Sequence, residues 1–567
     1  MIDDVMANLS PGLILILGAL LVPFLQDTPR RVWTLALPVL AFVHLVLLEQ
    51  GTHGIFTMFT VELATLRIDP LSEVFGYIFL IAAFLGMLYQ LHKSGWMEQV
   101  AGLIYAGSAI GAVFAGDLIT LFLFWEGTAI ASVFLIWAMR TPEAIAAGQR
   151  YLVMQISSGV LLLAGAMIHY GQTGSVAFES FDLNTLPGLL ILIAFGIKAA
   201  FPLLNNWLQD AYPEATVTGT VILSAFTTKL AIYALARGYA GTEILVPIGL
   251  VMIVLPTIHA VIENDLRRVL SYSLNIQLGF MVVGIGIGSD LALAGAVAHA
   301  ICGILYKCVL FMSLGAVLHR TGTAKSSELG GLYRSMPWTA AFCCIGAASI
   351  SALPLFAGFI SKSLIISAAI KDGDMVTWLI LIFASAVVIQ HSGLKIPFFA
   401  FFSRDNGLRP QEAPLNMLLA MGIASVLCVA IGIFPSAFYA LLPYDVKYHV
   451  YTLEHVVTQM QLLILSAVVF AVTIRTGLYP RQVRSINLDT DWLWRKPGAW
   501  VVGGVFRALL ASLAGATGKL AGASARLAKS LYHQHGPTGT LARTRPSGSM
   551  ALWMTVLMVA FLVFSFF

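Results

Sequence analysis

The chain has 567 residues, of which 59% are hydrophobic and only 11% are charged, and its formal net charge is +4. Soluble proteins carry about a quarter of their residues as charged side chains, so this composition and a mean hydropathy of +0.87 exclude a soluble enzyme. The small net charge gives no reason to expect a nucleic-acid partner.

Apolar runs of about 20 residues recur along the chain, and each can cross roughly 30 Å of hydrocarbon. We therefore predict an all-α polytopic membrane protein with about 16 transmembrane helices. The predicted segments start near Pro11, Val32, Leu71, Val100, Leu118, Tyr151, Leu186, Thr216, Ile244, Val269, Leu291, Trp338, Val376, Leu415, Met460 and Ala551. The first follows Asp3 and Asp4 without a small-residue cleavage site, which is not typical of a signal peptide. A short hairpin is predicted within Gly51–Arg67.

Basic residues alternate in density between successive loops, which indicates a membrane topology. With the N-terminus outside, the cytoplasmic loops carry twelve lysines and arginines and the opposite loops only four, Arg67, Arg237, Lys371 and Lys447. The polar tail from Arg475 to Arg545 adds eleven more on the cytoplasmic side. Five of the 32 basic residues remain, and all five lie within apolar segments.

These five are Lys198, Lys229, Lys307, Lys362 and Lys395, and Glu126 is the acid deep inside a predicted span. A charge at the centre of a spanning helix costs at least about 2.5–3.5 kcal/mol, so it normally faces the bundle interior and marks an ion or proton route. Glu126 and Lys198 each follow seven or more apolar positions and fit such a route. For Lys395, which lies close to a cytoplasmic loop, snorkelling near the helix end is an equal alternative.

Two of the lysines accompany breaks in helices. Lys198 precedes Pro202 by four residues, and Lys362 follows a second break around Pro354. Paired interrupted helices in the two halves of a chain are typical of inverted repeats with an ion site at the midplane. We predict N-terminal flanking helices over 1–97, inverted five-helix repeats over 98–238 and 239–396, and further helices over 397–476. A basic cytoplasmic segment over 477–548 and a final span over 549–567 complete the chain.

His299, Gly303 and Lys307 lie four residues apart and form one helical stripe, which favours a proton relay over a satisfied buried histidine. The five cysteines show neither CxxC nor metal-ligand spacing, and no haem, Fe–S or nucleotide motif is present, so no metal or cofactor is expected. Asp210 and Glu214 could either coordinate sodium or make polar loop contacts.

The polar tail contains a predicted amphipathic stretch. Its apolar positions, which share one helical stripe, are Phe506, Leu509, Leu513, Leu520, Leu527 and Leu531. Two alternatives follow from this pattern: a helix lying on the cytoplasmic leaflet, or a strap that reaches a neighbouring subunit.

Five motifs in order resemble the antiporter-like membrane subunits shared by Mrp-type cation/proton antiporters and respiratory complex I. They cover roughly residues 70–475. The motifs are Phe124-Trp125-Glu126, Lys198–Pro202 with Trp207–Ala211, Asp265–Ser273, His299 with Lys307–Phe311, and Leu353-Pro354 with Ala357–Lys362. The stretches Gly393–Phe399 and Asp489–Trp492 look most like the D-type subunit of Mrp antiporters.

The resemblance implies roles for particular residues. Glu126 would be the acid of the fifth helix, forming an ion pair with Lys198 of the broken seventh helix where protons enter. Lys229 would link the two halves. His299 and Lys307 would continue the route as a central polar axis through the bundle. Lys362 on the broken twelfth helix would be the terminal proton relay of this axis.

The resemblance also implies a function. It predicts a proton-translocating subunit of an Mrp-type Na⁺/H⁺ antiporter in a bacterial inner membrane, a transporter rather than an enzyme. Its partners would be other antiporter subunits in a hetero-oligomer, the lipid bilayer, protons and Na⁺. Two alternatives remain open: a proton-pumping subunit of a complex I-like dehydrogenase or membrane hydrogenase, and the membrane subunit of an inorganic-carbon uptake complex.

Overall fold

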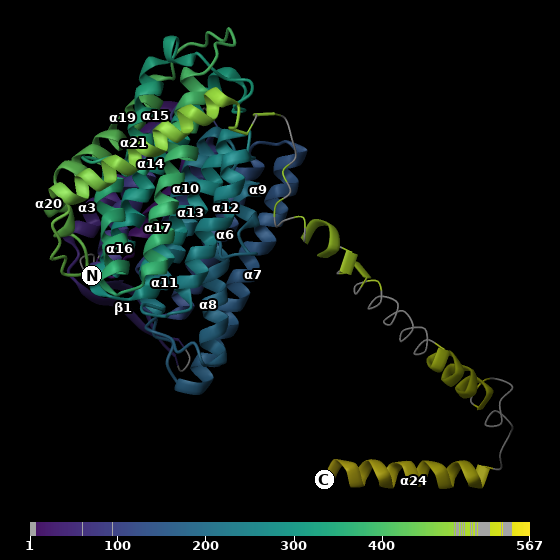
Figure 1. Cartoon of the computed structure of the whole chain (residues 1–567). Helices are drawn as coiled ribbons and strands as arrows, with labels where there is room; N and C mark the ends of the chain where they lie inside the picture. The colour runs from purple at the N-terminus through teal and green to yellow at the C-terminus, as the bar shows by residue number, and fades with distance from the viewer. Residues whose placement is uncertain are drawn as a thin grey trace. The chain divides into compact units, whose positions relative to one another are not determined.

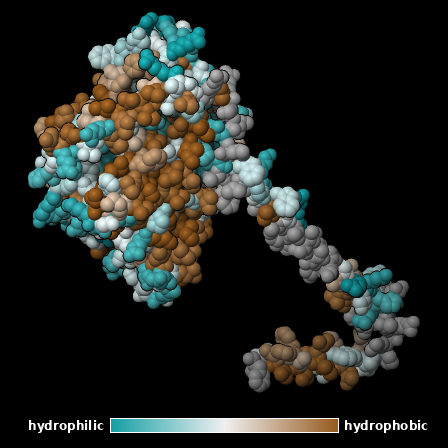
Figure 2. All heavy atoms as spheres, in the orientation of Figure 1, coloured by the Kyte–Doolittle hydropathy of each residue, from teal (hydrophilic) through white to brown (hydrophobic). Residues whose placement is uncertain are grey.

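The computed structural model describes residues 7–566 except 59–60, 93–94, 481, 484–486, 488, 490–491, 493, 499, 502, 505–506, 508–521, 535 and 537–546. It contains a core unit, which ends at Asn487, and a tail unit, Leu488–Phe567. The core unit is a bundle of helices packed side by side (Figure 1). Apolar side chains cover the middle of the visible face and polar ones gather toward its ends (Figure 2), which is the pattern of a protein that spans a bilayer.

Twelve spans among the described residues are long and apolar enough to cross a membrane. They are α3 (Asp27–Leu47), α4 (Pro70–Tyr89), α6 (Leu118–Trp137), α7 (Pro142–Thr173), α10 (Val217–Ala225) with α11 (Thr227–Gly238), α12 (Leu245–Ile262), α13 (Leu266–Ile287), α14 (Asp290–Thr321), α17 (Met375–Val388) with η3 (Ile389–Leu394), α18 (Lys395–Pro397) and η4 (Phe398–Phe402), α19 (Leu415–Ile433), α21 (Leu453–Thr476) and α24 (Ser547–Phe566).

Further helices complete the described chain. They are α2 (Pro11–Ala19) with η1 (Val22–Phe24), α5 (Trp96–Val113), α8 (Leu186–Lys198), α9 (Asn206–Ala211), η2 (Leu332–Arg334), α15 (Pro337–Ile350), α16 (Ala357–Lys371), α20 (Pro435–Tyr439) and η5 (Trp494–Gly498). Every predicted hydrophobic segment falls on a helix or starts at its edge, so the predicted all-α membrane fold is confirmed. The number of helices that cross the membrane and the repeat boundaries stay predictions.

The helix α14 lies at the centre of the core unit. It contacts α13, α15, α16, α10 and α19, and nearly all of its side chains are buried. A central helix has no lipid-facing side, so any polar group on it must find its partner inside the bundle. His299 and Lys307 are on this helix.

The predicted hairpin is present as β1 (Gly51–Met58) and β2 (Val61–Ile68), which pair antiparallel from Gly51 opposite Ile68. Asp117 fastens it to the bundle: one carboxylate oxygen accepts from the backbone amide of Ala64 at 3.0 Å. The other accepts from the amides of Ile119 and Thr120, which caps α6. The residue that caps the N-terminus of α6 therefore also attaches the hairpin to the bundle.

In the tail unit, α24 is a strongly apolar helix and residues 522–534 are helical. The predicted amphipathic stripe lies largely outside the described residues, because only Leu527 and Leu531 of it are described, and both are exposed. The choice between a leaflet-bound helix and an inter-subunit strap stays open.

An ion-pair cluster joins the hairpin to two helix ends of the core unit. Asp69 caps α4 and accepts from Arg237 of α11 at 2.8 Å, and Arg67 of β2 lies 3.5 Å from the same carboxylate. Burial alone would raise the pKa of Asp69, but Arg237, the Ser72 amide and Arg67 outweigh it and hold this pKa below its ordinary value. Arg237 also donates to Tyr233 at 2.9 Å.

We expect Asp69→Asn to keep the α4 cap and lose the ion pair, which lowers the stability by roughly 1.5–3 kcal/mol at neutral pH. A carboxyl group with a lowered pKa binds fewer protons when folded, so its contribution is present above its ordinary pKa of about 3.9 and is lost below it. Thermal unfolding in detergent should show a constant difference between wild type and variant from pH 5 to 8 that shrinks below about pH 4. A difference that grows toward acid pH would contradict this assignment.

Candidate functional site

Both predicted helix breaks are present, and their backbones match. The first separates α8 from α9, with Ala200 and Leu203 at φ of 61° and 68°. The second separates α15 from α16, with Ala352 and Leu355 at φ of 59° and 73°. A non-glycine residue in this region is strained, at about 1–3 kcal/mol each. Each half of the chain therefore contains two strained residues three positions apart with a proline between them, Pro202 in the first break and Pro354 in the second.

Lys198 ends α8 and is completely buried against α6. Its Nζ donates to the backbone carbonyl of Trp125 at 2.6 Å and to Oγ1 of Thr128 at 2.7 Å, and it lies 4.4 Å from the centre of the Trp125 ring. The Trp125 ring is itself fixed, because its Nε1 donates to Ser158 of α7 at 2.9 Å. Backbone, hydroxyl and ring together replace the hydration of the ammonium group.

Glu126 lies one residue beyond Trp125, on a different side of α6. Its Oε1 is buried and has no hydrogen-bond partner among the described residues. The carboxylate rests over Gly159 of α7, where an added Cβ would come within 1.4 Å of Oε1. In the described part of the chain Glu126 and Lys198 interact electrostatically without forming a contact ion pair. The structure thus brings the two residues near each other, but Lys198 donates to Trp125 and Thr128 and not to the Glu126 carboxylate.

Lys229 and Lys362 occupy equivalent settings at helix ends. Lys229 on α11 donates to the carbonyl of Ser224 at 2.7 Å, close to the end of α10. Lys362 on α16 donates to the carbonyl of Ile350 at 2.8 Å, the last residue of α15. Both side chains are buried. The final carbonyls of a helix lack intrahelical partners and carry partial negative charge, so they suit an ammonium group.

The stripe on α14 is buried as predicted for an interior route. His299 contacts Oγ of Ser361 at 3.0 Å through Nδ1 and Oε1 of Gln277 at 2.9 Å through Nε2. Lys307 has one long hydrogen bond, 3.3 Å, to the carbonyl of Leu270. The described core unit therefore contains Lys198, Lys229, His299, Lys307 and Lys362 as buried polar groups, and Glu126 at its partly buried flank.

The structure adds two residues to this set. Lys395 is fully buried and donates to the carbonyls of Ala260, Val261 and Glu263 at the end of α12, at 3.2, 2.7 and 2.6 Å. The snorkelling alternative is therefore wrong, because the ammonium caps a neighbouring helix instead of reaching solvent. His391, four residues before it, is also buried. A histidine four residues before a lysine shares a helical face with it, as His299 and Lys307 do at eight residues, and this spacing is the sequence signal for His391.

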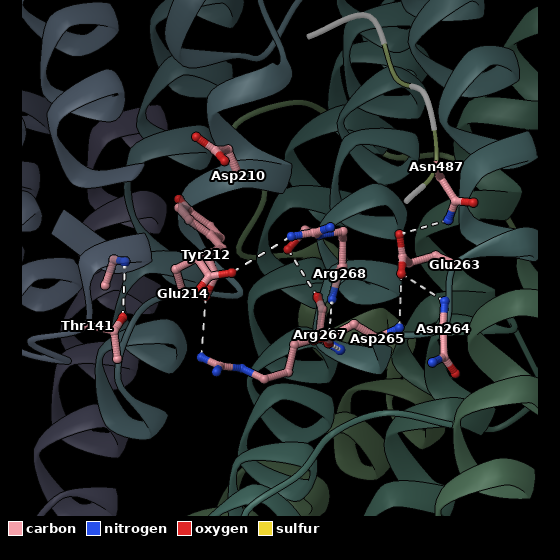
Figure 3. Close-up of polar contacts among 12 residues, drawn as sticks. Thr141, Asp210, Tyr212, Glu214, Glu263, Asn264, Asp265, Arg267, Arg268 and Asn487 are labelled. Atoms are coloured by element: carbon pink, nitrogen blue, oxygen red, sulfur yellow. Dashed lines mark hydrogen bonds and ion pairs between the residues drawn. The ribbon is translucent and has the colours of Figure 1, made fainter. Parts of the chain in front are cut away.

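A polar cluster covers one end of the bundle around the starts of α10 and α13 (Figure 3). Arg267 donates to the carbonyl of Ala215 at 2.8 Å and to the Thr220 hydroxyl, which clamps the loop after the first break. Arg268 lies 3.8 Å from Glu214. Burial raises the pKa of Glu214, and Arg268 opposes that shift.

Asp210 pairs with Arg150 at 2.7 Å. Because Asp210 and Glu214 each face an arginine, the geometry favours polar loop contacts over sodium coordination.

Comparisons with known proteins show which proteins the chain resembles. Residues 115–389 match the family described as "NADH:quinone oxidoreductase/Mrp antiporter, TM". Over this region the chain is similar to antiporter-like membrane subunits. The A-type subunit of the Na⁺/H⁺ antiporter from Alkalihalophilus pseudofirmus is 29% identical over 495 residues, which is 76% of this chain and 61% of that protein. The D-type subunit from the same organism is 30% identical over 321 residues, 53% of this chain and 65% of that protein.

A component of a hydrogenase is also among the similar proteins. Hydrogenase-4 component B of Escherichia coli is 26% identical over 420 residues, 65% of this chain and 62% of that protein. The chain thus spans 61–65% of the length of these three curated relatives.

Solved structures share the fold. A chain of the Mrp complex from Dietzia sp. DQ12-45-1b matches with a TM-score of 0.70 at 20% identity, over 78% of this chain and 96% of that one. A chain of the membrane-bound sulfane sulfur reductase, an archaeal respiratory membrane complex, matches with a TM-score of 0.71 at 21% identity. The match covers 98% of this chain and 99% of that one. These matches confirm the antiporter-like fold of the chain.

We expect Gly159→Ala to displace the Glu126 carboxylate, because the new methyl group would occupy the position of Oε1. The matched control is Gly171→Ala on the same helix, where an added Cβ meets nothing within 4 Å. Proton flux in everted vesicles should fall by about tenfold in the first variant, equivalent to about 1.4 kcal/mol, and stay at the wild-type level in the second. Equal flux in both would show that the position of Glu126 is unimportant.

Proposed function

We propose that the chain is the proton-translocating subunit of a multi-subunit Mrp-type Na⁺/H⁺ antiporter in the inner membrane of a bacterium. Protons move along Glu126, Lys198, Lys229, His299, Lys307 and Lys362. The observation that carries this proposal is the set of buried lysines, each held by a backbone carbonyl. The A-type and D-type relatives are both named as Na⁺/H⁺ antiporter components, which supports sodium as the exchanged ion.

Carbonyl partners suit a group that must both hold and release a proton. An ammonium in a low-dielectric interior needs oxygen acceptors, because burial without them costs several kcal/mol. A carboxylate 4 Å away would stabilise the ammonium by about 4 kcal/mol at an effective dielectric constant of 20. When a lysine loses its proton, a carbonyl is left neutral, whereas a carboxylate would be left as an uncompensated charge. Deprotonation is therefore easier beside a carbonyl.

Glu126 supplies an adjustable charge beside the first lysine. If the carboxylate moves toward Lys198, it stabilises the ammonium form, and if it moves away, the proton is released toward Lys229. A membrane potential contributes about 2.3 kcal/mol per charge per 100 mV, which is comparable with this electrostatic change. The carboxylate position thus couples the gradient to the protonation of the axis.

A second candidate function is proton pumping in a redox-driven membrane complex. It is favoured by the match to the sulfane sulfur reductase chain over nearly the full length of both chains, and by hydrogenase-4 component B as a relative. In such a complex this chain would conduct protons along the same axis, and the redox centres would belong to other subunits.

The deciding experiment measures acridine-orange quenching in everted vesicles from an antiporter-deficient host that expresses the chain together with the membrane proteins encoded beside it. We expect added Na⁺ to dissipate the ΔpH, and Glu126→Gln and Lys198→Ala each to lower that rate by about 100-fold or more. Size-exclusion elution in detergent should show both variants folded. Wild-type rates in either variant would refute the proposed proton route.

The same vesicles separate the two candidate functions. Dissipation of ΔpH by Na⁺, K⁺ or Li⁺ supports the antiporter and its cation. A ΔpH that no cation affects, but that an electron donor generates only when this chain is present, overturns the antiporter in favour of the pump.

A further inference from the structure

The span from Met375 to Phe402 contains an unusual irregularity. Two π-helical turns, η3 and η4, lie on either side of Lys395, so the helix is locally wider than an α-helix. Such turns are rare and are often found at functional sites. His391 lies inside the first turn, is completely buried, and is not used by the proton route proposed above.

The hydrogen bonds around His391 define which ring nitrogen carries the proton. Oγ of Ser392 donates to Oγ of Ser273 on α13 at 2.7 Å, and it lies 2.8 Å from Nδ1 of His391. Because the hydroxyl hydrogen of Ser392 points to Ser273, the remaining lone pairs of Ser392 accept from Nδ1–H. The neutral ring then carries its proton on Nδ1 and a lone pair on Nε2.

Nε2 of His391 is the unusual atom. It is buried and has no hydrogen-bond partner among the described residues. A buried acceptor left without a donor costs about 1–3 kcal/mol, and such groups in native structures call for an explanation. One explanation is that Nε2 accepts a proton during turnover.

Three lysines act on the ring electrostatically. They are Lys307 of α14, Lys395 of α18 and Lys362 of α16, and no carboxylate in the described part of the chain is among the groups that act on the ring. Three ammonium groups oppose a fourth charge on His391, so the ring takes a proton when a neighbour gives one up.

The neighbouring lysines differ in how firmly they are held. Lys395 is fixed by three carbonyls, and Lys362 donates to the Ile350 carbonyl at 2.8 Å. Among the described residues, Lys307 makes only its long 3.3 Å bond to Leu270, so its ammonium group is the least stabilised of the three. Lys307 is therefore the natural proton donor to the ring.

We propose that His391 is a further proton-carrying residue of the axis, which accepts a proton on Nε2 from the ammonium group of Lys307, with Ser392 and Ser273 as positioning residues. In this step an N–H bond of Lys307 breaks and the Nε2–H bond of His391 forms, so the total charge is unchanged. The proposal rests on the proposed proton route and extends it from α14 to the π-helical span.

The ring state can be measured independently of transport. Solid-state NMR of the full-length protein in lipid, with ¹⁵N-labelled histidine, identifies the His391 signals as those absent from His391→Gln. We expect the Nδ1–H tautomer with an unprotonated Nε2 at neutral pH, and a shift toward the Nε2–H tautomer in Ser392→Ala. An Nε2–H tautomer in the wild type, or a ring unaffected by Ser392→Ala, would overturn the proposal.

Transport tests the role of the ring in the coexpressed complex in everted vesicles. We expect His391→Gln to lower the rate of ΔpH dissipation by about 100-fold while its elution profile stays that of the folded protein. His44→Gln is the matched control, because the Nε2 of this buried histidine already contacts the carbonyl of Leu9 at 2.9 Å; its rate should equal that of the wild type.

The outcomes separate this proposal from the function on which it rests. If Glu126→Gln is inactive and His391→Gln is fully active, the proton route stands and the role of His391 is refuted. If the wild-type complex itself responds to no cation, the antiporter function fails, and the NMR tautomer alone then decides whether His391 is a proton acceptor. If His391→Gln does not fold, the Ser392→Ala spectrum makes the same decision.

Discussion

The need to place ammonium groups inside an apolar bundle governs this structure. Water cannot solvate them there, so each must find oxygen acceptors within the protein. Five buried lysines do so through backbone carbonyls, and three of these, Lys229, Lys362 and Lys395, use carbonyls at or near the ends of α10, α15 and α12. Helix ends inside the bundle therefore supply the acceptors for three of the five lysines, because the last carbonyls of a helix lack intrahelical partners. Lys198 and Lys307 instead use carbonyls within α6 and α13.

Acids and bases are segregated by position in the core unit. At its ends, carboxylates face arginines: Asp69 pairs with Arg237, and Asp210 pairs with Arg150. Arginine remains charged at all relevant pH values, so these pairs stabilise the fold without exchanging protons. In the interior, lysines with neutral partners form the polar axis, and Glu126 at its flank is held apart from Lys198. Arginine–carboxylate pairs thus stabilise the bundle ends, and lysines with neutral partners occupy its interior.

Much of this arrangement could be predicted from the sequence. Pro202 and Pro354 predict the two helix breaks, and the intramembrane lysines predict an interior polar route. Contacts were harder to predict. The family resemblance implies an ion pair between Glu126 and Lys198, whereas the structure directs Lys198 to Trp125 and Thr128. Lys395 has equal alternatives in the sequence, and His391 is indicated there only by its four-residue spacing from Lys395.

The sequence by itself determined what is local: the apolar spans, the helix breaks and the cost of each intramembrane charge. These follow from composition, spacing and the geometry of proline. Only the tertiary structure decided which oxygen atom accepts from each lysine and which nitrogen of His391 is left without a partner. Those partners come from residues as distant as Ala260 and Lys395 or Ser273 and Ser392, and their meeting depends on how the helices pack around α14.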